Sequence, residues 1–467
     1  MDHPSSTSRE KNPQNARGCR NTGPVEGKGP MPKALPDGCR GGAAASDCDD
    51  DDDDSFPEFS GGVDRRGQHT VKHSFTPDGV LPMWVADMDL ATAPVVHAAI
   101  VERARHPTFG YTVQPPELWE AVSAWQREQH GWTVHPDEFV FASNLVSATV
   151  NFLHAFTAPG DAVAVLLPLY APLRDAVSGA GRRPVELRMA DAGADGGPAA
   201  PFGALDLPGM RRAFLAEGVR ALVWCSPHNP IGRVWSAPEQ RAVARLCQEC
   251  GVFLLSDEIH ADLTLWGLRH VPMATSCADI GYAHVVTASS PGKAWNLAGL
   301  HGGFVVIQDD GLRRRYRAVV EHACLHFGSA FATVGMLAAY RHGGPWLARL
   351  RRYIQSNVVL VERHLAAHAP EIVVHRPQAS FLIWMDCAAL GLEAVDGGAR
   401  SELCTFMEKR ARLKLSDGFS FGGAPAGRYQ RMNVACSRSV LREALRRLGA
   451  AVAELRAERR GAHLSVK

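Results

Sequence analysis

The stretch HVVTASSPGKAWNLAGL, residues 284–300, joins an apolar run to a lysine that follows it almost at once. The run HVVTAS is rich in β-branched residues and does not alternate with polar ones, which is typical of a strand buried on both faces. A Ser-Pro-Gly turn then leads to Lys293, and a second apolar run follows. The sequence therefore predicts a single amine at the end of a buried strand, although a lone lysine is usually a solvated surface residue.

Further continuous apolar runs of the same kind occupy residues 162–168, 221–226, 252–257 and 303–307. Helical patterns lie between them, such as residues 237–251, which have Pro near the start and Gly at the end. Apolar runs that alternate with helices are typical of a mostly parallel sheet covered by helices. We therefore expect an α/β fold with a mostly parallel, doubly wound sheet in a large domain over residues 96–330.

The pattern changes after residue 330. A long helical stretch over about 344–368 precedes strand-like runs at 372–376, 379–386 and 428–436, and a closing helix runs from Ser439 to about Arg456. This order predicts a smaller α+β C-terminal domain over residues 331–460.

The first sixty residues differ from the rest in composition. They are rich in Gly, Pro, Ser and Asn, contain few aliphatic side chains, and include six consecutive aspartates at 49–54. A segment that cannot bury apolar surface is predicted to be disordered. We interpret residues 1–60 as a solvated polar and acidic tail rather than as a cation-binding or partner-binding segment.

Overall composition excludes several classes of function. The 467 residues carry 50 Lys and Arg against 49 Asp and Glu, so the bulk charge does not indicate binding to nucleic acid or to an anionic membrane. We find no apolar run of the roughly 18 residues that cross a bilayer and no apolar signal-peptide core, so we expect a cytoplasmic protein. The eleven cysteines are expected to be reduced thiols, and the CxxC pair Cys247 and Cys250 lacks a second pair, so no metal site is predicted.

Polar and aromatic side chains follow the predicted strands, at the edge of an α/β sheet where ligands bind. They are Tyr170, Asn229, Asp257, His260, Ser290 and Lys293. Taken singly, each has an ordinary explanation as a surface residue, a helix cap or a turn. Together they supply an amine, a carboxylate, an amide, a hydroxyl and an aromatic ring, which are the groups that bind pyridoxal 5′-phosphate.

The order of these residues is similar to that of a known family. Tyr170, Asn229 in NPIG, Asp257 in SDEIH, and Ser290 with Lys293 in S-x-x-K resemble the class I/II aminotransferases, which are fold type I pyridoxal-phosphate enzymes. The MalY/PatB group of cystathionine β-lyases is a closer match over residues 80–450, through LPMWVADMDL (81–90), FGYT (109–112), SDEIHADL (256–263), AAYRHGGPWL (338–347) and RMNVACSRSVLREAL (431–445).

The resemblance implies roles around the cofactor. Lys293 would hold pyridoxal phosphate as a Schiff base and act as the acid and base at the substrate's Cα. Asp257 would pair with the ring nitrogen, and Asn229 with His260 would contact the ring oxygen. The remaining cofactor contacts would come from Tyr170, stacked on the ring, from Ser290, Asn144 and Leu145 at the phosphate, and from Tyr111, which would reach the phosphate of a neighbouring subunit.

The resemblance also implies a substrate site and an assembly. Arg431 would clamp the substrate carboxylate, a bidentate task that suits a guanidinium. Trp84, Asp87 and Trp295 would line the entrance, with packing or helix capping as the alternative for all three. Residues 61–95 would form an N-terminal arm that contributes to the small domain and to this entrance. The family is homodimeric, so we expect a homodimer with the active site at the interface and a small amino-acid substrate.

Three positions depart from the family's pattern. Asn144 stands where the phosphate loop usually has Gly, and Asn tolerates an unusual φ better than other side chains. Gly292 replaces a residue that is often Ser or Thr, and His301 stands where classical aminotransferases have a phosphate-binding Arg. These departures bear on cofactor affinity and on the substrate rather than on the fold.

The function predicted from the sequence is that of a carbon–sulfur β-lyase. Such an enzyme would cleave cystathionine or another S-substituted cysteine, including a conjugate of secondary metabolism, to a thiol, pyruvate and ammonia. The alternatives are an aminotransferase, or a decarboxylating or deaminating enzyme of the same fold. An alternative of another class is a non-catalytic interaction protein that retains the fold, with the acidic tail as its working part.

Overall fold

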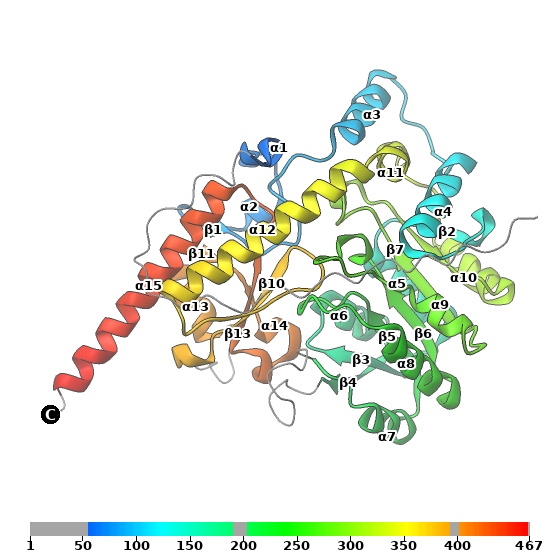
Figure 1. Cartoon of the computed structure of the whole chain (residues 1–467). Helices are drawn as coiled ribbons and strands as arrows, with labels where there is room; N and C mark the ends of the chain where they lie inside the picture. The colour runs from blue at the N-terminus through cyan, green and yellow to red at the C-terminus, as the bar shows by residue number, and fades with distance from the viewer. Residues whose placement is uncertain (1–54, 190–202, 393–400, 466–467) are drawn as a thin grey trace, which may run out of the picture. The chain divides into compact units, whose positions relative to one another are not determined.

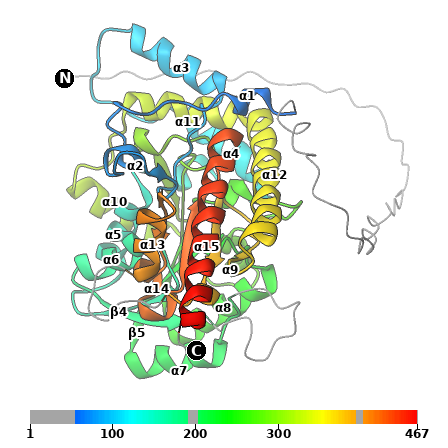
Figure 2. The same cartoon turned by 90° about the vertical axis from the view of Figure 1, so that its left-hand side faces the viewer.

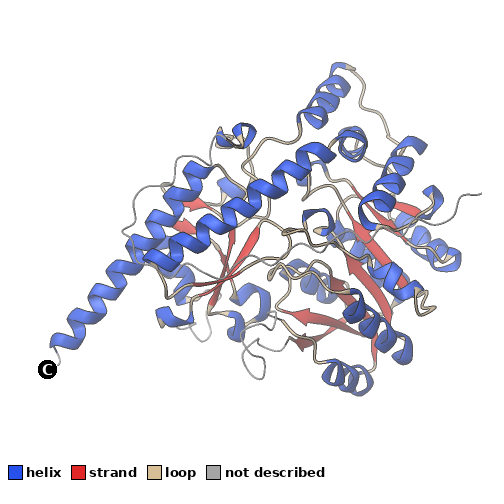
Figure 3. Ribbon diagram, viewed as in Figure 1, coloured by secondary structure: helices blue, strands red, loops and turns tan. Residues whose placement is uncertain are grey.

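The computed structural model describes residues 55–189, 203–392 and 401–465, all of which belong to one compact unit (Figures 1 and 3). Its main feature is a seven-stranded sheet with the strand order β2-β8-β7-β6-β5-β3-β4. The strands are β2 (Phe139–Ala142), β3 (Ala162–Leu167), β4 (Arg183–Arg188), β5 (Val219–Cys225), β6 (Phe253–Asp257), β7 (Val285–Ser289) and β8 (Gly303–Val306). Strands β4, β3, β5, β6 and β7 are parallel, whereas β8 runs antiparallel to both of its neighbours. The predicted mostly parallel sheet is confirmed.

The two faces of this sheet explain why its strands read as continuous apolar runs. In β3, Val163, Val165 and Leu167 pack into one hydrophobic cluster, whereas Ala164 and Leu166 pack into another on the opposite face. A strand buried on both faces needs no polar positions. The helices around this sheet are α3 (Pro94–Arg105), α4 (Pro116–His130), α5 (Leu145–Phe156), α6 (Ala171–Gly179), α7 (Leu207–Glu217), α8 (Ala237–Cys250), α9 (Met273–Ala278), α10 (Asp310–His322) and α11 (Ala330–His342).

Helix ends are set by local sequence. Ser236 and Glu239 form a capping box at the start of α8, and Gly251 ends the helix with a φ of 63°. Each side chain of the box satisfies a backbone N–H that the first turn would leave unpaired. The left-handed conformation at Gly251 is one that other residues adopt at a cost.

A second, antiparallel sheet has the strand order β12-β13-β10-β9. Its strands are β9 (Val373–His375), β10 (Leu382–Asp386), β12 (Ser416–Asp417) and β13 (Tyr429–Asn433). The long helices α12 (Gly344–His368) and α15 (Arg438–Ser465) lie side by side beside it (Figures 1 and 2). Two short helices, α13 (Glu402–Lys409) and α14 (Phe419–Gly422), complete this region. The predicted smaller α+β part of the fold is confirmed, although α15 runs to Ser465 rather than ending near Arg456.

An N-terminal arm, here taken as residues 55–95 with the predicted arm 61–95 inside it, accepts hydrogen bonds from Asn296, which follows β7, and from Asn433 of β13. It contains α1 (Pro57–Ser60), α2 (Val71–Ser74) and β1 (Leu81–Pro82), and β1 pairs in parallel with β11 (Leu413–Lys414). The prediction of a disordered tail over residues 1–60 is wrong for residues 55–60, because Phe59 is buried against Trp346 and Tyr353. The remainder of the predicted tail lies outside the described residues.

Two further observations concern the composition-based expectations. Within the ranges 55–189, 203–392 and 401–465, no helix is both long and apolar enough to cross a membrane. Over the same ranges, no group of three metal-binding side chains comes together, and Cys247 and Cys250 are free thiols on α8. The edge strand β4 was not predicted, because its residues alternate between exposed and buried and do not form a continuous apolar run.

Candidate active site

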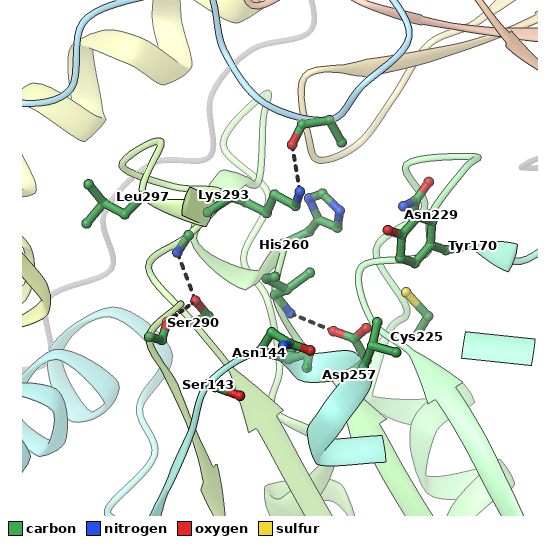
Figure 4. Close-up of a pocket in the computed structure, with 17 residues that line it drawn as sticks. Ser143, Asn144, Tyr170, Cys225, Asn229, Asp257, His260, Ser290, Lys293 and Leu297 are labelled. Atoms are coloured by element: carbon green, nitrogen blue, oxygen red, sulfur yellow. Dashed lines mark hydrogen bonds between the residues drawn. The ribbon is translucent and has the colours of Figure 1, made fainter. Parts of the chain in front are cut away.

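A pocket lies at the carboxyl ends of strands β3, β5, β6 and β7, and we call it the inner pocket (Figure 4). It contains about 800 Å³ of atom-free space, part of which is open to solvent. Eight of the predicted site residues line it: Asn144, Leu145, Tyr170, Asn229, Asp257, His260, Ser290 and Lys293. These residues are far apart in the sequence and meet because parallel strands end at one edge of the sheet.

Lys293 follows β7 and extends across the pocket toward the arm. Its Nζ donates a hydrogen bond of 2.6 Å to the carbonyl oxygen of Ala86. Burial, with the positive charge of Arg431 as a second cause, lowers the pKa of this amine to about 8. A lysine with this pKa is partly neutral near physiological pH, as a nucleophile or a proton acceptor must be.

Asp257 is the last residue of β6 and is buried on the pocket floor. Its Oδ1 accepts a hydrogen bond of 3.1 Å from the backbone N–H of Ile259. Burial raises the pKa of this carboxyl to about 7, and the nearby Lys293 opposes the shift. A buried carboxyl with so few donors is stabilised as an anion by a protonated ring nitrogen placed beside it.

Asn229 and Arg431 form one unit, which the sequence did not indicate. The guanidinium of Arg431 donates from Nη1 to Oδ1 of Asn229 at 2.9 Å and from Nη2 to the carbonyl of Trp84 at 2.9 Å. Burial lowers the pKa of Arg431 to about 10, so the group remains charged. Its Nε is buried without a hydrogen-bond partner in the described structure, which leaves a donor for a carboxylate.

His260 is buried in the inner pocket, and neither ring nitrogen has a hydrogen-bond partner in the described part of the chain. Burial, together with the charges of Lys293 and Arg431, lowers the pKa of His260 to about 3, so the ring is neutral. Both ring nitrogens are therefore available to a ligand in the inner pocket.

The opposite end of the inner pocket is formed by the start of α5. Asn144 caps this helix by accepting a hydrogen bond of 2.8 Å from the N–H of Ser147. The tolerance of Asn for an unusual φ is not used at Asn144, because its φ is −160°, which is extended backbone. The N–H groups of a helix N-terminus nevertheless favour a phosphate. The hydroxyl of Ser290 beside it donates to the carbonyl of Gly302 at 2.6 Å.

A second pocket, which we call the outer pocket, opens on the other side of Lys293. It is lined by Lys293, Arg431 and Tyr170, by the arm residues Val71, Phe75, Pro77, Trp84, Val85 and Ala86, and by a wall that includes Cys404, Glu408, Lys414, Ser416, Asp417 and Phe421. Lys293, Tyr170 and Ala86 line both pockets, so the two pockets adjoin at Lys293.

The remaining predicted site residues have different positions. Trp84 lines the outer pocket, whereas Asp87 lines a third pocket next to Lys293 and pairs with Arg65 at 2.6 Å. Trp295 does not line the entrance: it is fully buried and donates to the carbonyl of Gly343. Tyr111 is 95% exposed and lies away from these pockets.

Reasoning from sequence predicted that the arm contributes to the site entrance, but not that its backbone carbonyls hold the functional side chains. The carbonyls of Trp84 and Ala86 accept hydrogen bonds from Arg431 and Lys293, and the amide of Asn433 donates to two further arm carbonyls at 2.7 and 2.6 Å. A carbonyl is present in every residue, so no sequence signal could have found these contacts. The opposite charges of Arg65 and Asp87 are the one feature of the sequence that could have suggested that these two residues form an ion pair.

Comparison with known proteins places this geometry in a family. The family model for "Aminotransferase class I and II" matches residues 80–448. The chain belongs to the class I and II aminotransferase family. Within this family it is 36% identical to the cystathionine β-lyase PatB of Bacillus subtilis over 83% of this chain and 98% of that protein. It is 28% identical to the protein MalY of Escherichia coli over 82% and 96%.

A solved structure supports the same relationship. The pyridoxal-phosphate-bound carbon–sulfur lyase of Staphylococcus hominis superposes with a TM-score of 0.77 at 27% identity, over 85% of this chain and 99% of that one. The cofactor of the protein described here is pyridoxal 5′-phosphate, as in the rest of its family. The residues of the inner pocket fit this cofactor. Lys293 provides the amine, Asp257 the carboxylate for the ring nitrogen, His260 a neutral unpaired ring, and α5 the N–H groups for a phosphate.

Proposed function

We propose that this protein is a pyridoxal-phosphate-dependent carbon–sulfur β-lyase that cleaves S-substituted cysteines to a thiol, pyruvate and ammonia. The observation that carries this proposal is the position of Lys293 between the inner pocket, which fits the cofactor, and the outer pocket, which contains Arg431. The relatives named for cystathionine β-lyase and carbon–sulfur lyase activity support the same reaction.

Binding of the substrate depends on Arg431. Its buried guanidinium already donates to Asn229 and Trp84, which fixes its orientation, and the unpaired Nε donor remains for the substrate's α-carboxylate. A fixed, desolvated arginine favours a carboxylate over neutral groups. Of the described residues that line the inner and outer pockets, Arg431 is the one arginine, so a second carboxylate of a dicarboxylic substrate has no equivalent partner there.

Lys293 moves the proton. When bound, pyridoxal phosphate withdraws electrons from the substrate's Cα. Lys293 accepts the Cα proton, because burial holds its pKa near 8. The electron pair left at Cα forms the Cα–Cβ double bond, and the Cβ–S bond breaks with both electrons leaving on sulfur as a thiolate. Water then converts the released 2-aminoacrylate to pyruvate and ammonia.

The test is the distribution of products from S-ethyl-L-cysteine and the holoenzyme. We expect ethanethiol, pyruvate and ammonia in equal amounts over many turnovers. A keto acid that retains the sulfur would identify an aminotransferase, and release of carbon dioxide would identify a decarboxylating enzyme. Either of these results would contradict the lyase proposal.

We further propose a homodimer in the cytoplasm, in which Tyr111 reaches the phosphate of the neighbouring subunit. Its exposure, and that of Phe109 and Phe327 beside it, supports a contact with a second copy, because exposed apolar clusters commonly mark interfaces. The free thiols among the described cysteines support a reducing compartment. We propose that the large domain ends near residue 330, where the chain enters α11.

A further inference from the structure

Residues of the arm form one wall of the outer pocket. This wall is apolar and exposed to solvent. Phe75 is 65% exposed and Val71 is 54% exposed, and both line the pocket. These residues are four positions apart across α2 and so lie on one side of it. Trp84 adds an indole ring to the same wall. Side chains of this size are normally buried, so a cluster of them next to a reactive amine indicates a surface that a ligand covers.

This wall is held in place and is not a frayed end. Lys72, between Val71 and Phe75 in sequence, points into the protein, and its Nζ binds Asp89 at 2.5 Å. The indole N–H of Trp84 donates to the carbonyl of Lys72 at 3.1 Å. The buried ion pair and this hydrogen bond fix which side of α2 faces the pocket, so Val71 and Phe75 are presented to it.

The charged side chains of the outer pocket are engaged by the protein itself. The ammonium of Lys414 lies 4.6 Å from the centre of the Trp84 ring and donates to the carbonyl of Phe75. The carboxylate of Asp417 accepts from the backbone N–H and the hydroxyl of Ser401, each at 2.9 Å. Glu408 is not free either. A substrate with a charged far end would have to compete with these contacts, whereas an apolar one would not.

The position of Arg431 decides which pocket receives the substrate's side chain. Arg431 lines the outer pocket, whereas the third pocket, which also reaches Lys293, is lined by Arg65, His69 and Asp87 and not by Arg431. An amino acid with its carboxylate on Arg431 and its Cα at Lys293 therefore already lies in the outer pocket. Its Cβ and sulfur then continue toward the wall formed by the arm.

We propose that Phe75, Val71 and Trp84 bind the leaving group, and that the preferred substrates are cysteines with a large apolar or aromatic S-substituent. This inference rests on the proposed lyase function and specifies its substrate class. A benzyl or similar group would cover the exposed surfaces of Phe75 and Val71, and transfer of that surface from water favours its binding. Small S-alkyl cysteines would react but would leave the wall uncovered.

The experiment compares kcat/KM of the holoenzyme for S-methyl-, S-benzyl-L-cysteine and cystathionine, with pyruvate as the readout. We expect S-benzyl-L-cysteine to be preferred over both others by about tenfold or more, the discrimination typical of an apolar pocket. Phe75→Ala should lower kcat/KM for S-benzyl-L-cysteine by about tenfold and change that for S-methyl-L-cysteine by less than about twofold. The matched control is Leu215→Ala, which removes a leucine that is 60% exposed on α7, and it should change neither value.

The outcomes separate this inference from the function on which it rests. Pyruvate from S-methyl-L-cysteine without a preference for the benzyl substrate, or with equal effects of Phe75→Ala on both, would overturn the inference and leave the lyase. A selective loss of S-benzyl-L-cysteine turnover in His69→Ala would place the leaving group in the third pocket and would also overturn the inference. Absence of pyruvate from all three substrates would overturn both proposals.

Discussion

The sheet edge and the N-terminal arm contribute to the same site in different ways. At the sheet edge, Asp257 and Lys293 end or follow strands that are buried on both faces. The arm has little regular structure near the site, and side chains from elsewhere satisfy its carbonyls, among them Asn433 and Asn296. The sheet edge is therefore held by packing, whereas the arm is held both by the core packing of side chains such as Met83, Met88 and Leu90 and by hydrogen bonds to its carbonyls.

This difference separates the chemistry of the site from its specificity. Proton transfer needs groups fixed to within a fraction of an ångström, which strand ends provide. Choice of substrate needs a surface that can vary without disturbing the core, which loops provide. Substitutions at the sheet edge should therefore abolish the reaction. Substitutions in the arm should instead change the stability of the protein and its preference among substrates.

The largest effect is expected at Lys293. Lys293→Ala should remove the absorbance band that arises from the covalent bond between lysine and cofactor, because it deletes the amine. It should also lower kcat by about 10³-fold or more, because it deletes the proton acceptor. The matched control is Lys414→Ala, which removes another lysine of the outer pocket and should retain the band. Absorbance spectra and pyruvate assays measure both. A retained band in Lys293→Ala would break the assignment of the chemistry to the sheet edge.

Arg431 comes next, because it joins the sheet edge to the arm through Asn229 and Trp84. Arg431→Leu should lower kcat/KM about 10²- to 10³-fold, as expected for the loss of a buried charged donor to a ligand carboxylate. Arg431→Lys should recover little of this, because an ammonium lacks the bidentate geometry. The cofactor absorbance should be unchanged in both variants. A loss of cofactor binding instead would mean that Arg431 supports the inner pocket.

The buried carboxyl of Asp257 should make the stability of the protein depend on pH. Its pKa is raised to about 7 in the folded state without cofactor, above its ordinary value near 4, so only the unfolded state loses the proton between these values. The cofactor-free protein should therefore lose stability as the pH rises from about 4 through 7. Asp257→Asn removes this dependence and should stabilise the cofactor-free protein by on the order of 3 kcal/mol near pH 8 but not near pH 4. Denaturant melts at several pH values measure this, and parallel pH profiles for both proteins would contradict it.

The smallest effect is expected in the arm's ion pairs, where two adjacent arginines form a matched pair. Arg65 is mostly buried and binds Asp87 at 2.6 Å and Asp89 at 2.8 Å, whereas Arg66 is exposed and pairs with Asp64. Arg65→Met should cost about 1–2 kcal/mol of stability, less than a fully buried pair because some solvent reaches it. Arg66→Met should leave the stability nearly unchanged, because this pair is exposed to solvent. Equal effects in denaturant melts would show that burial of the Arg65 pair does not stabilise the protein.

The difference between the sheet edge and the arm also determines which parts of the site could be predicted from the sequence. Continuous apolar runs mark buried strands, so the sequence alone places Asp257 and Lys293 at one edge of the sheet. Trp295 was misplaced because an aromatic residue near a catalytic lysine reads alike whether it packs in the core or lines a pocket. The contacts made by the carbonyls of Trp84 and Ala86 depend on the path of the arm, which no periodicity encodes. Phe75 has no motif, and only its exposure beside a pocket marks it.

The most direct test of the account is to find which lysine holds the cofactor. The holoenzyme is reduced with borohydride, digested, and analysed by mass spectrometry to locate the pyridoxyl group. We expect the label on the peptide that contains Lys293, at close to one group per chain, because that amine is buried between the two pockets and partly neutral. A label on Lys414 or another lysine, or no stoichiometric label, would contradict the central claim that the sheet edge carries the chemistry.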